Sequence, residues 1–241
     1  MKKTLCAVLC YNNKNTLAKV IKEEKKIKNI CDIIFINDGS SDNTKEILKS
    51  YKLKTVNHKK NMGYGRAVKS AFKYASNKNY HFLAIFPADN QRYIEDLKKM
   101  IKISKKSDSD LVVGSKYKVL EKIPPHRKIG NIFFSKMASI FWNCKIIDVL
   151  SGFKIYRVNS FYKYIDNLPN DYSFDIVLSQ LISFKKMKFL ELYVKCRYNN
   201  DTSSMMGIFK LNIKNIIYIG FKMIFDIFVF YLKYKFIEKN K

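Results

Sequence analysis

The sequence predicts an α/β protein with a mostly parallel sheet and helices on both of its faces. Up to residue 115, short hydrophobic runs rich in β-branched and aromatic residues alternate with longer stretches of helical periodicity. Two of these runs, Ile33–Ile36 and Phe82–Phe86, lead directly into acidic turns. Strands that alternate with helices form parallel sheets, and such sheets bind ligands beyond the carboxyl ends of their strands.

The alternation predicts the following strands and helices in the first 115 residues. The expected strands are apolar runs bounded by turn residues, at Thr4–Leu9, Ile33–Ile36, Lys54–Val56, Phe82–Phe86 and Leu111–Val113. The expected helices lie between them, at Thr16–Lys26, Asn43–Ser50, Gly65–Ser76 and Tyr93–Lys105. Asp42 is available to cap the second helix.

Beyond residue 115 the regular alternation ends. Pro124 and Pro125 mark a loop. The elements expected after it are a helix, a turn entering a strand, a second helix and a last strand, at Asn131–Trp142, Asp148–Tyr156, Phe174–Phe184 and Phe189–Lys195.

The last segment, Gly207–Lys241, is apolar, aromatic and basic. Charges interrupt it at Lys222, Asp226, Lys233 and Lys235. Because charges are costly inside hydrocarbon, we expect an amphipathic helix in the bilayer interface and not a span. A helix that docks on the protein's own core would explain the same pattern. The expected division is one domain at 1–205 and C-terminal helices at 206–241.

The net charge and the cysteine content of the sequence indicate which binding partners and which cellular compartment to expect. The net charge of +26 suits an anionic membrane or nucleic acid, but the lysines are spread along the chain, and we favour membrane attraction over nucleic-acid binding. The five cysteines are odd in number and form no C-x-x-C pair, so neither a disulfide framework nor a zinc site is expected. We therefore expect a cytoplasmic protein, peripheral on the cytoplasmic face of the membrane.

The second acidic turn offers ligands for a hard metal ion. Asp89 and Gln91 carry side-chain oxygens two residues apart, directly after a predicted strand. Mg²⁺ and Mn²⁺ accept such oxygens when the phosphates of a substrate complete the coordination shell. We expect Mg²⁺ or Mn²⁺ as the cofactor.

The two acidic turns, in this order and spacing, resemble the family 2 glycosyltransferases with the GT-A fold, a Rossmann-like sheet. The branch that looks nearest is the dolichyl- and polyprenyl-phosphate sugar synthases. The matching motifs are Tyr11-Asn12, Asn37–Thr44, Asn61–Ala67, Pro87–Gln91, Gly114–Lys116, and Asp148 with Ser151–Lys154. One departure is clear, since Pro87 stands where the family has the first aspartate of D-x-D.

The resemblance implies a role for each group of residues. Contacts with the nucleotide sugar are implied for Tyr11, Asn12, Asp38, Gly63, Gly65, Arg66, Ala88, Asp89 and Lys116. Contacts with the acceptor or with phosphate are implied for Arg127, Ser151, Gly152, Phe153, Lys154 and Arg197. Asp89 and Gln91 would bind the metal, and Asp89 and Asp175 would be catalytic.

Simpler interpretations stay open for several of these residues. Asp38 also fits an Asx turn, and Gly63 and Gly65 fit ordinary turns. The segment from Ser151 to Phe153 also fits a β-turn that leads into a core phenylalanine. Single basic residues in so basic a chain also fit solvated surface charges.

The function implied is inverting transfer of a sugar from a nucleotide diphosphate sugar to a polyprenyl phosphate. An alternative is transfer to a sugar hydroxyl of a surface polysaccharide or lipopolysaccharide, which requires a general base, and Asp175 is the candidate. A lipid phosphate is already anionic, so Asp175 would then only position it. Because Pro87 removes a carboxylate, a relative that binds nucleotide sugars without turnover is a further alternative.

Overall fold

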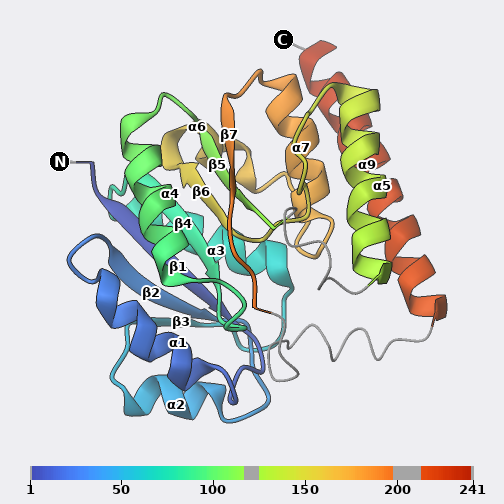
Figure 1. Cartoon of the computed structure of the whole chain (residues 1–241). Coiled ribbons are helices and arrows are strands. Elements are labelled where there is room, and N and C mark those ends of the chain that lie inside the picture. Colours follow the sequence, from blue (N-terminus) through green and yellow to red (C-terminus); the bar gives the residue numbers. More distant parts are fainter. Residues whose placement is uncertain (1, 117–124, 198–212, 240–241) are drawn as a thin grey trace.

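The computed structural model describes residues 2–116, 125–197 and 213–239, with side chains except at 125–127, 213–216 and 236–239 (Figure 1). A seven-stranded sheet with the order β3-β2-β1-β4-β6-β5-β7 forms its centre. The strands are β1 (Thr4–Cys10), β2 (Asp32–Asn37), β3 (Thr55–Asn57), β4 (Phe82–Pro87), β5 (Leu111–Ser115), β6 (Lys154–Arg157) and β7 (Phe189–Tyr193). Only β6 runs antiparallel to its neighbours, β4 and β5, so the predicted mostly parallel α/β sheet is confirmed.

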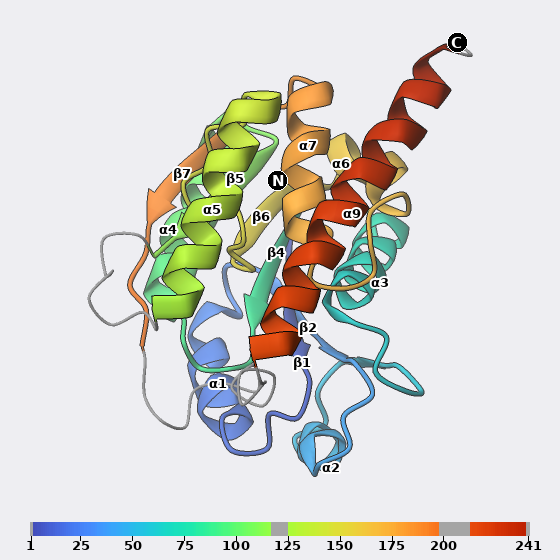
Figure 2. The same cartoon turned by 90° about the vertical axis from the view of Figure 1, so that its right-hand side faces the viewer.

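The helices lie on both faces of this sheet (Figures 1 and 2). They are α1 (Leu17–Glu24), the 3-10 helix η1 (Lys25–Ile27), α2 (Thr44–Ser50), α3 (Tyr64–Asn77), α4 (Ile94–Lys106), α5 (Pro125–Trp142), α6 (Val158–Ile165), α7 (Phe174–Phe184) and α9 (Ile213–Lys239). The four helices expected before residue 115 are present, whereas α6 is an addition to the predicted order. Asp42 accepts the N–H of Thr44 (3.0 Å) at the start of α2, although the capping position itself is Asn43.

Strand alternation divides the buried side chains into two cores. Leu5 and Ala7 of β1 belong to the core beneath α3, α6 and α7, whereas Cys6 and Val8 belong to the core beneath α1 and α4. This division follows from the two-residue period of a strand whose faces are both covered. It leaves the two ends of the sheet as the places where polar loops gather.

The C-terminal helix α9 packs on α7 with one face. Met223, Ile227 and Phe230 are buried in the same core as α3 and α6. The rings of Phe184 and Tyr234 lie 4.5 Å apart between the two helices. The docking-helix interpretation therefore describes this inner face.

The opposite face of α9 also carries large apolar side chains. Phe221, Phe225 and Phe228 on that face are 69%, 63% and 57% exposed. The helix therefore has two apolar faces, one covered by the protein and one uncovered. Within the described residues, no helix combines the length and apolarity that crossing a bilayer requires.

Candidate functional site

The carboxyl ends of β1, β2 and β4 lie side by side at one edge of the sheet. Cys10 pairs with Asn37, and Leu9 pairs with Pro87. The two acidic turns, which follow β2 and β4, therefore emerge on either side of the loop after β1. This is the edge at which open α/β sheets bind their ligands.

Hydrogen bonds tie the loop after β1 to both acidic turns. The N–H of Asn12 donates to Ser40 Oγ (3.0 Å), and Thr16 Oγ1 donates to the carbonyl of Ala88 (2.7 Å). Asn12 adopts a positive φ of 53°, which asparagine tolerates better than most residues. Tyr11 is 36% exposed, so its ring is open to solvent at this edge.

Asp38 lies in the first acidic turn and is bound to the protein on several sides. Its Oδ1 lies 2.6 Å from His58 Nδ1 and accepts the N–H of Met62 (3.0 Å), while Oδ2 accepts the N–H of Gly63 (2.9 Å). His58 Nε2 in turn lies 2.8 Å from Ser70 Oγ. Within the protein, the Asp38 carboxylate therefore organises the loop that ends at α3.

The glycines of that loop serve close packing of the backbone. Gly63 has a φ of +95°, and a Cβ there would lie 2.5 Å from the carbonyl oxygen of Asn170. At Gly65 a Cβ would collide with the carbonyl oxygen of Pro169. The N–H of Arg66 donates to the Asn170 carbonyl (2.9 Å). The amino end of α3 is therefore packed against the loop that contains Pro169 and Asn170.

The second acidic turn holds the expected metal ligands. Asp89 Oδ1 accepts the N–H of Gln91 (3.0 Å), and Asn90 between them has a φ of +57°. No group of three or more acidic, histidine or cysteine side chains suited to a metal occurs among the described residues. One carboxylate and one amide fit Mg²⁺ or Mn²⁺ only if a ligand's phosphates and water supply the other positions.

Arg197 holds the second acidic turn in place through hydrogen bonds. Its N–H donates to the carbonyl of Gln91 (2.9 Å), and its guanidinium donates to Asn90 Oδ1 (2.8 Å) and Glu23 Oε1 (3.1 Å). The guanidinium also lies 3.9 Å from the centre of the Tyr93 ring. The structure therefore places Arg197 as a support of the turn that carries Asp89 and Gln91.

The segment implied to line the acceptor side is mostly internal. Ser151 and Phe153 are fully buried, and Ser151 Oγ donates to the carbonyl of Gly114 (2.7 Å). A Cβ at Gly152 would lie 3.4 Å from the hydroxyl oxygen of Tyr64. The β-turn interpretation therefore describes Ser151 and Phe153, which support the site without facing it.

Lys154 and Asp175 form a buried ion pair beneath that segment. Lys154 Nζ lies 2.7 Å from Asp175 Oδ1 and also donates to the carbonyls of Val149 and Ser151. Burial raises the pKa of Asp175 above its usual value, and the Lys154 ammonium opposes that rise. Tyr64 OH donates weakly to the same Oδ1 (3.5 Å). Because its three N–H donors point at protein oxygens, Lys154 supports Asp175 and is not an open phosphate ligand.

Lys116 and Arg127 complete the set of basic residues implied by the resemblance. The N–H of Lys116 donates to Asp148 Oδ2 (3.1 Å), and its Nζ lies 3.6 Å from the same oxygen. Asp148 is fully buried, and its N–H donates to Glu191 Oε1 (2.9 Å). Arg127 lies in the first turn of α5, and its side chain is outside the described residues.

Several residues of the site carry no signal in the sequence. His58, Glu23 and Asn90 hold the two acidic turns in place, as described above. Tyr172 is close enough for the charges of Tyr11 and Asp38 to affect its pKa, which burial chiefly raises. Tyr64 and Asn90 lie inside motifs, Asn61–Ala67 and Pro87–Gln91, but at variable positions, so a motif comparison alone could not select them.

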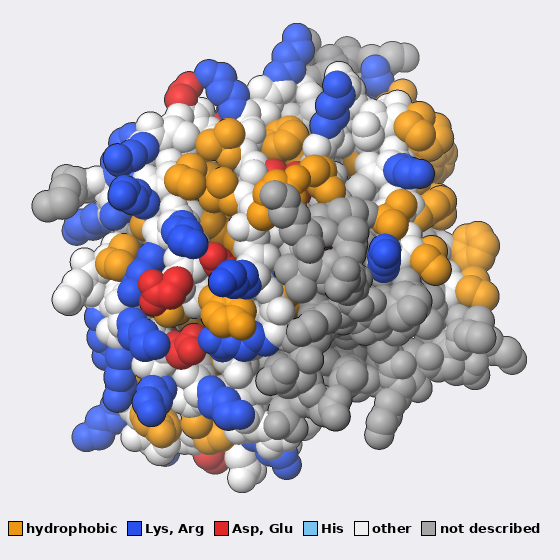
Figure 3. Space-filling model, in the orientation of Figure 1, with side chains coloured by type: hydrophobic (Ala, Val, Ile, Leu, Met, Phe, Trp, Pro, Cys, Tyr) orange, Lys and Arg blue, Asp and Glu red, His pale blue; other side chains and the backbone are white. Residues whose placement is uncertain are grey.

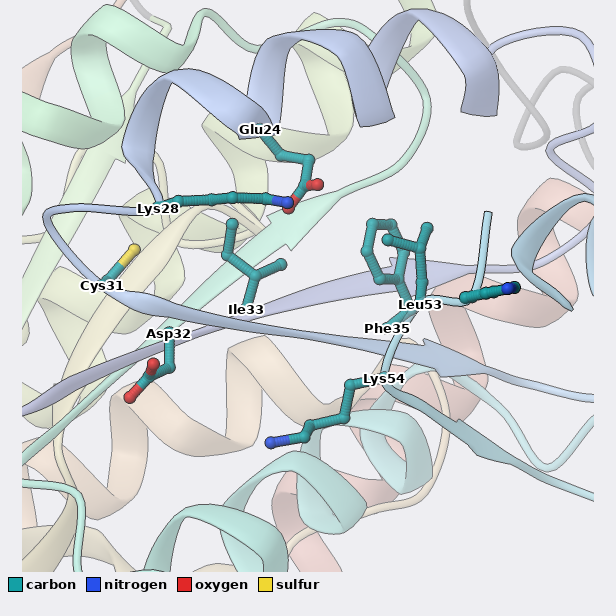
Figure 4. A pocket seen from close by; sticks show the side chains of 9 residues that line it. Glu24, Lys28, Cys31, Asp32, Ile33, Phe35, Leu53 and Lys54 are labelled. Carbon is teal, nitrogen blue, oxygen red and sulfur yellow. The ribbon is translucent and has the colours of Figure 1, made fainter. Parts of the chain in front are cut away.

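A cavity of about 320 Å³ lies at the other end of β2 (Figure 4). Its lining includes Glu24, Lys28, Asp32 and Leu53, and Lys28 extends toward the Glu24 carboxylate. Burial raises the pKa of Glu24. Because β2 begins at Asp32, this cavity lies at the amino end of the strands, opposite the motif residues.

Comparison with known proteins identifies the fold and several relatives. A glucosyl-3-phosphoglycerate synthase from Mycobacterium tuberculosis matches with a TM-score of 0.66 at 12% identity, over 86% of this chain and 73% of that one, and so shares the predicted GT-A-like fold. An uncharacterised protein of Methanocaldococcus jannaschii is 27% identical, over 83% of this chain and 90% of that protein.

Another relative is named for its reaction. A UDP-N-acetylglucosamine–dolichyl-phosphate N-acetylglucosaminyltransferase of Methanococcus voltae is 27% identical, over 56% of this chain and 65% of that protein. The model of the family "Glycosyl transferase family 2" matches residues 6–165, which span both acidic turns and the Lys154 segment. The chain belongs to glycosyltransferase family 2 and is a nucleotide-sugar-dependent transferase.

Proposed function

We propose that this protein transfers a sugar from a nucleotide diphosphate sugar to a polyprenyl, dolichyl-type phosphate, with inversion at the anomeric carbon. It would do so at the cytoplasmic face of a membrane. The observation that carries the proposal is the grouping of the loop after β1 with both acidic turns at the carboxyl edge of the sheet. An exposed ring at Tyr11 and oxygen ligands at Asp89 and Gln91 suit a nucleotide and its diphosphate there.

The donor side is assigned by its chemistry. Asp89 and Gln91 would hold Mg²⁺ or Mn²⁺, which supplies Lewis-acid neutralisation of the departing nucleoside diphosphate. The fold relative from M. tuberculosis has been crystallised with Mn²⁺ and UDP, which supports a metal-assisted donor site. Arg197, Asn90 and Glu23 would keep the turn that carries these ligands in place.

The acceptor is assigned from charge and from a relative. The relative from M. voltae is named for transfer to dolichyl phosphate. A phosphate acceptor is anionic before the reaction, so it attacks without losing a proton, and no general base is needed. The basic character of the chain, with a net charge of +26, favours such an acceptor.

The test is a screen for released nucleoside diphosphate, on the purified full-length protein. UDP- and GDP-sugars are offered with Mn²⁺ or Mg²⁺, with and without a short-chain polyprenyl phosphate. We expect release that requires both the metal and the lipid phosphate. Binding of nucleotide sugars without release from any pair would instead indicate a non-catalytic relative, in line with the loss of a carboxylate at Pro87.

A second candidate, transfer to a sugar hydroxyl, is favoured by one observation. Burial raises the pKa of Asp175, which is the direction that a general base requires. Asp175→Asn distinguishes the two acceptors. A modest loss of kcat supports the lipid phosphate, whereas a loss of about a hundredfold or more supports the hydroxyl.

A further inference from the structure

The exposed apolar side chains of this protein are concentrated on two helices. Of the 19 large hydrophobic side chains that are exposed in the described residues, 12 belong to α5 and α9. We call these 12 residues the α5–α9 surface. They are Ile129, Phe133, Ile140, Phe141, Ile217, Tyr218, Phe221, Ile224, Phe225, Phe228, Tyr231 and Leu232. Scattered apolar residues are normal on a soluble protein, but so dense a group marks a surface that meets another phase or partner.

The exposed apolar residues are separate from the side chains with which α5 and α9 pack on the core. Phe134 and Trp142 of α5 and Phe230 of α9 already bury the inner faces of both helices against the protein. The two helices lie on either side of α7 (Figure 2). In the space-filling view, hydrophobic side chains interspersed with basic ones line the right-hand edge, where Figure 1 places α5 and α9 (Figure 3).

Apart from one paired aspartate, the charged side chains described on these two helices are basic. Lys136 of α5 and Lys233 and Lys235 of α9 are exposed. Asp226 is the single acidic side chain described on the two helices, and Lys222 Nζ neutralises it at 2.6 Å. A second copy of the chain would bring like charges together on this surface, which is unfavourable. An anionic partner is electrostatically complementary.

The surface is also connected to the candidate site. Lys222 of α9 lies 2.5 Å from Asp171, in the loop directly before α7. Tyr172, the next residue, is the one whose pKa is influenced by Tyr11 and Asp38. A partner bound on α9 would therefore lie close to the loop that borders the site.

We propose that the α5–α9 surface binds an anionic lipid bilayer. The aromatic and aliphatic side chains would enter the headgroup region, and the surrounding lysines would contact lipid phosphates. The 27 residues of α9 make a helix about 40 Å long, which would lie along the membrane and not cross it. The inference deepens the proposed function, since a polyprenyl phosphate resides in a bilayer, and it adds α5 to the C-terminal segment.

The test is flotation of the full-length protein with lipid vesicles, in the absence of donor and acceptor. We expect binding to phosphatidylcholine vesicles that contain about 30% phosphatidylserine, weaker binding to pure phosphatidylcholine, and release by salt. Two multiple variants remove the exposed apolar side chains, F221Q/F225Q/F228Q on α9 and I140Q/F141Q on α5. Each should reduce vesicle binding by about tenfold or more.

A matched control is Tyr51→Gln, because Tyr51 is 50% exposed at the end of α2 and outside this surface. Its vesicle binding should equal that of the unchanged protein. Equal binding by the control and both multiple variants would overturn the proposal. So would a protein that dimerises through these helices and ignores anionic vesicles.

Two further readouts keep the outcomes distinct. If a multiple variant fails to fold, the exposed lysines supply the test, because K233Q/K235Q should lower binding to anionic vesicles and leave the thermal unfolding unchanged. Vesicle binding without nucleoside diphosphate release would remove the proposed function and leave this inference intact. Turnover of a short-chain acceptor in solution without vesicle binding would do the reverse.

Discussion

At the scale of single residues, the buried charges of Lys154 and Asp175 stabilise each other. Both are buried, and Lys154 Nζ lies 2.7 Å from the carboxylate. Taking either charge out of water is costly, and the partner offsets that cost. The pair therefore stabilises the site only while it is complete, which makes Lys154 a positioning residue.

Lys154→Met should lower the free energy of unfolding by about 3 kcal/mol at pH 8, because it leaves the Asp175 carboxylate buried and unpaired. Burial already raises the pKa of Asp175, and loss of the ammonium raises it further, so the carboxyl takes up a proton more readily as the pH falls. The loss of stability should therefore shrink toward pH 5. Urea unfolding at both pH values measures this. K154M/D175N should regain most of the loss, and equal losses at both pH values would contradict the argument.

Pro87 determines how many charged ligands the metal turn offers. It is the last residue of β4, two positions before Asp89, and it stands where the family has another aspartate. Pro87→Asp would add a second carboxylate at this edge. Affinity for a hard divalent cation rises with the number of charged oxygen ligands.

We expect Pro87→Asp to lower the Mn²⁺ concentration for half-maximal nucleoside diphosphate release by about tenfold. Metal titration at saturating donor measures this. Asn90→Asp, which adds a charge at the residue bound to Arg197, is the matched control and should not have this effect. An unchanged metal requirement in Pro87→Asp would indicate that position 87 does not face the ion.

At the scale of elements, the short chain segment after β7 supports the metal turn. Val194 N–H donates to Ser115 carbonyl (2.8 Å), Lys195 N–H donates to Asp96 Oδ2 (2.9 Å), and Arg197 reaches the turn itself. The hydrogen bonds of these three residues hold the segment across the carboxyl end of β5 and the first turn of α4. The geometry of Asp89 and Gln91 therefore depends on residues that are about 100 positions away in the chain.

Arg197→Ala should raise both the KM for the donor and the metal concentration for half-maximal activity by about tenfold, because the turn loses its guanidinium support. Glu23→Gln, which removes only the far end of the ion pair, should shift both in the same direction by less. Steady-state kinetics with varied donor, metal and acceptor measures these changes. If Arg197→Ala alters only the KM of the acceptor, then Arg197 contacts the acceptor phosphate, as the family resemblance implies.

Elements were predictable from the sequence where local pattern decides them. The runs at Ile33–Ile36 and Phe82–Phe86 became β2 and β4 because uninterrupted apolar segments bounded by turns suit a doubly covered strand. The strand expected at the end of Asp148–Tyr156 is β6, but its antiparallel direction was not predicted, because it depends on pairing with β4 and β5, which are distant in sequence. The helix α6 was not predicted either.

The candidate site was also only partly predictable from the sequence, because contacts between distant residues decide the roles of its side chains. The motifs located both acidic turns correctly at one edge, but they did not reveal which side chains face a ligand. Asp38 binds His58 and two backbone N–H groups, and Lys154 binds Asp175, through contacts between residues 20 or more positions apart. A sequence motif identifies these residues, but it does not show whether their side chains contact the substrate or other parts of the protein.

At the scale of the whole molecule, α9 belongs to the main core as much as to a separate segment. Met223, Ile227 and Phe230 are buried together with side chains of β1, α3 and α7. The predicted boundary between 1–205 and 206–241 would separate them from that core. Cutting the chain there would expose the inner face of α9's partner, α7.

A chain that ends at residue 205 should lose about 4 kcal/mol or more of its unfolding free energy, since burying each large apolar side chain contributes roughly 1.5 to 3 kcal/mol. Because small domains have about 5 to 15 kcal/mol in total, the shortened protein should melt well below the full chain and bind a hydrophobic dye. Thermal unfolding of both chains measures this. The full-length F221Q/F225Q/F228Q protein is the control, because its outward side chains leave the core untouched and its melting temperature should not change. Equal melting temperatures of the shortened and full chains would show that α9 is an appendage, and the predicted domain boundary would then stand.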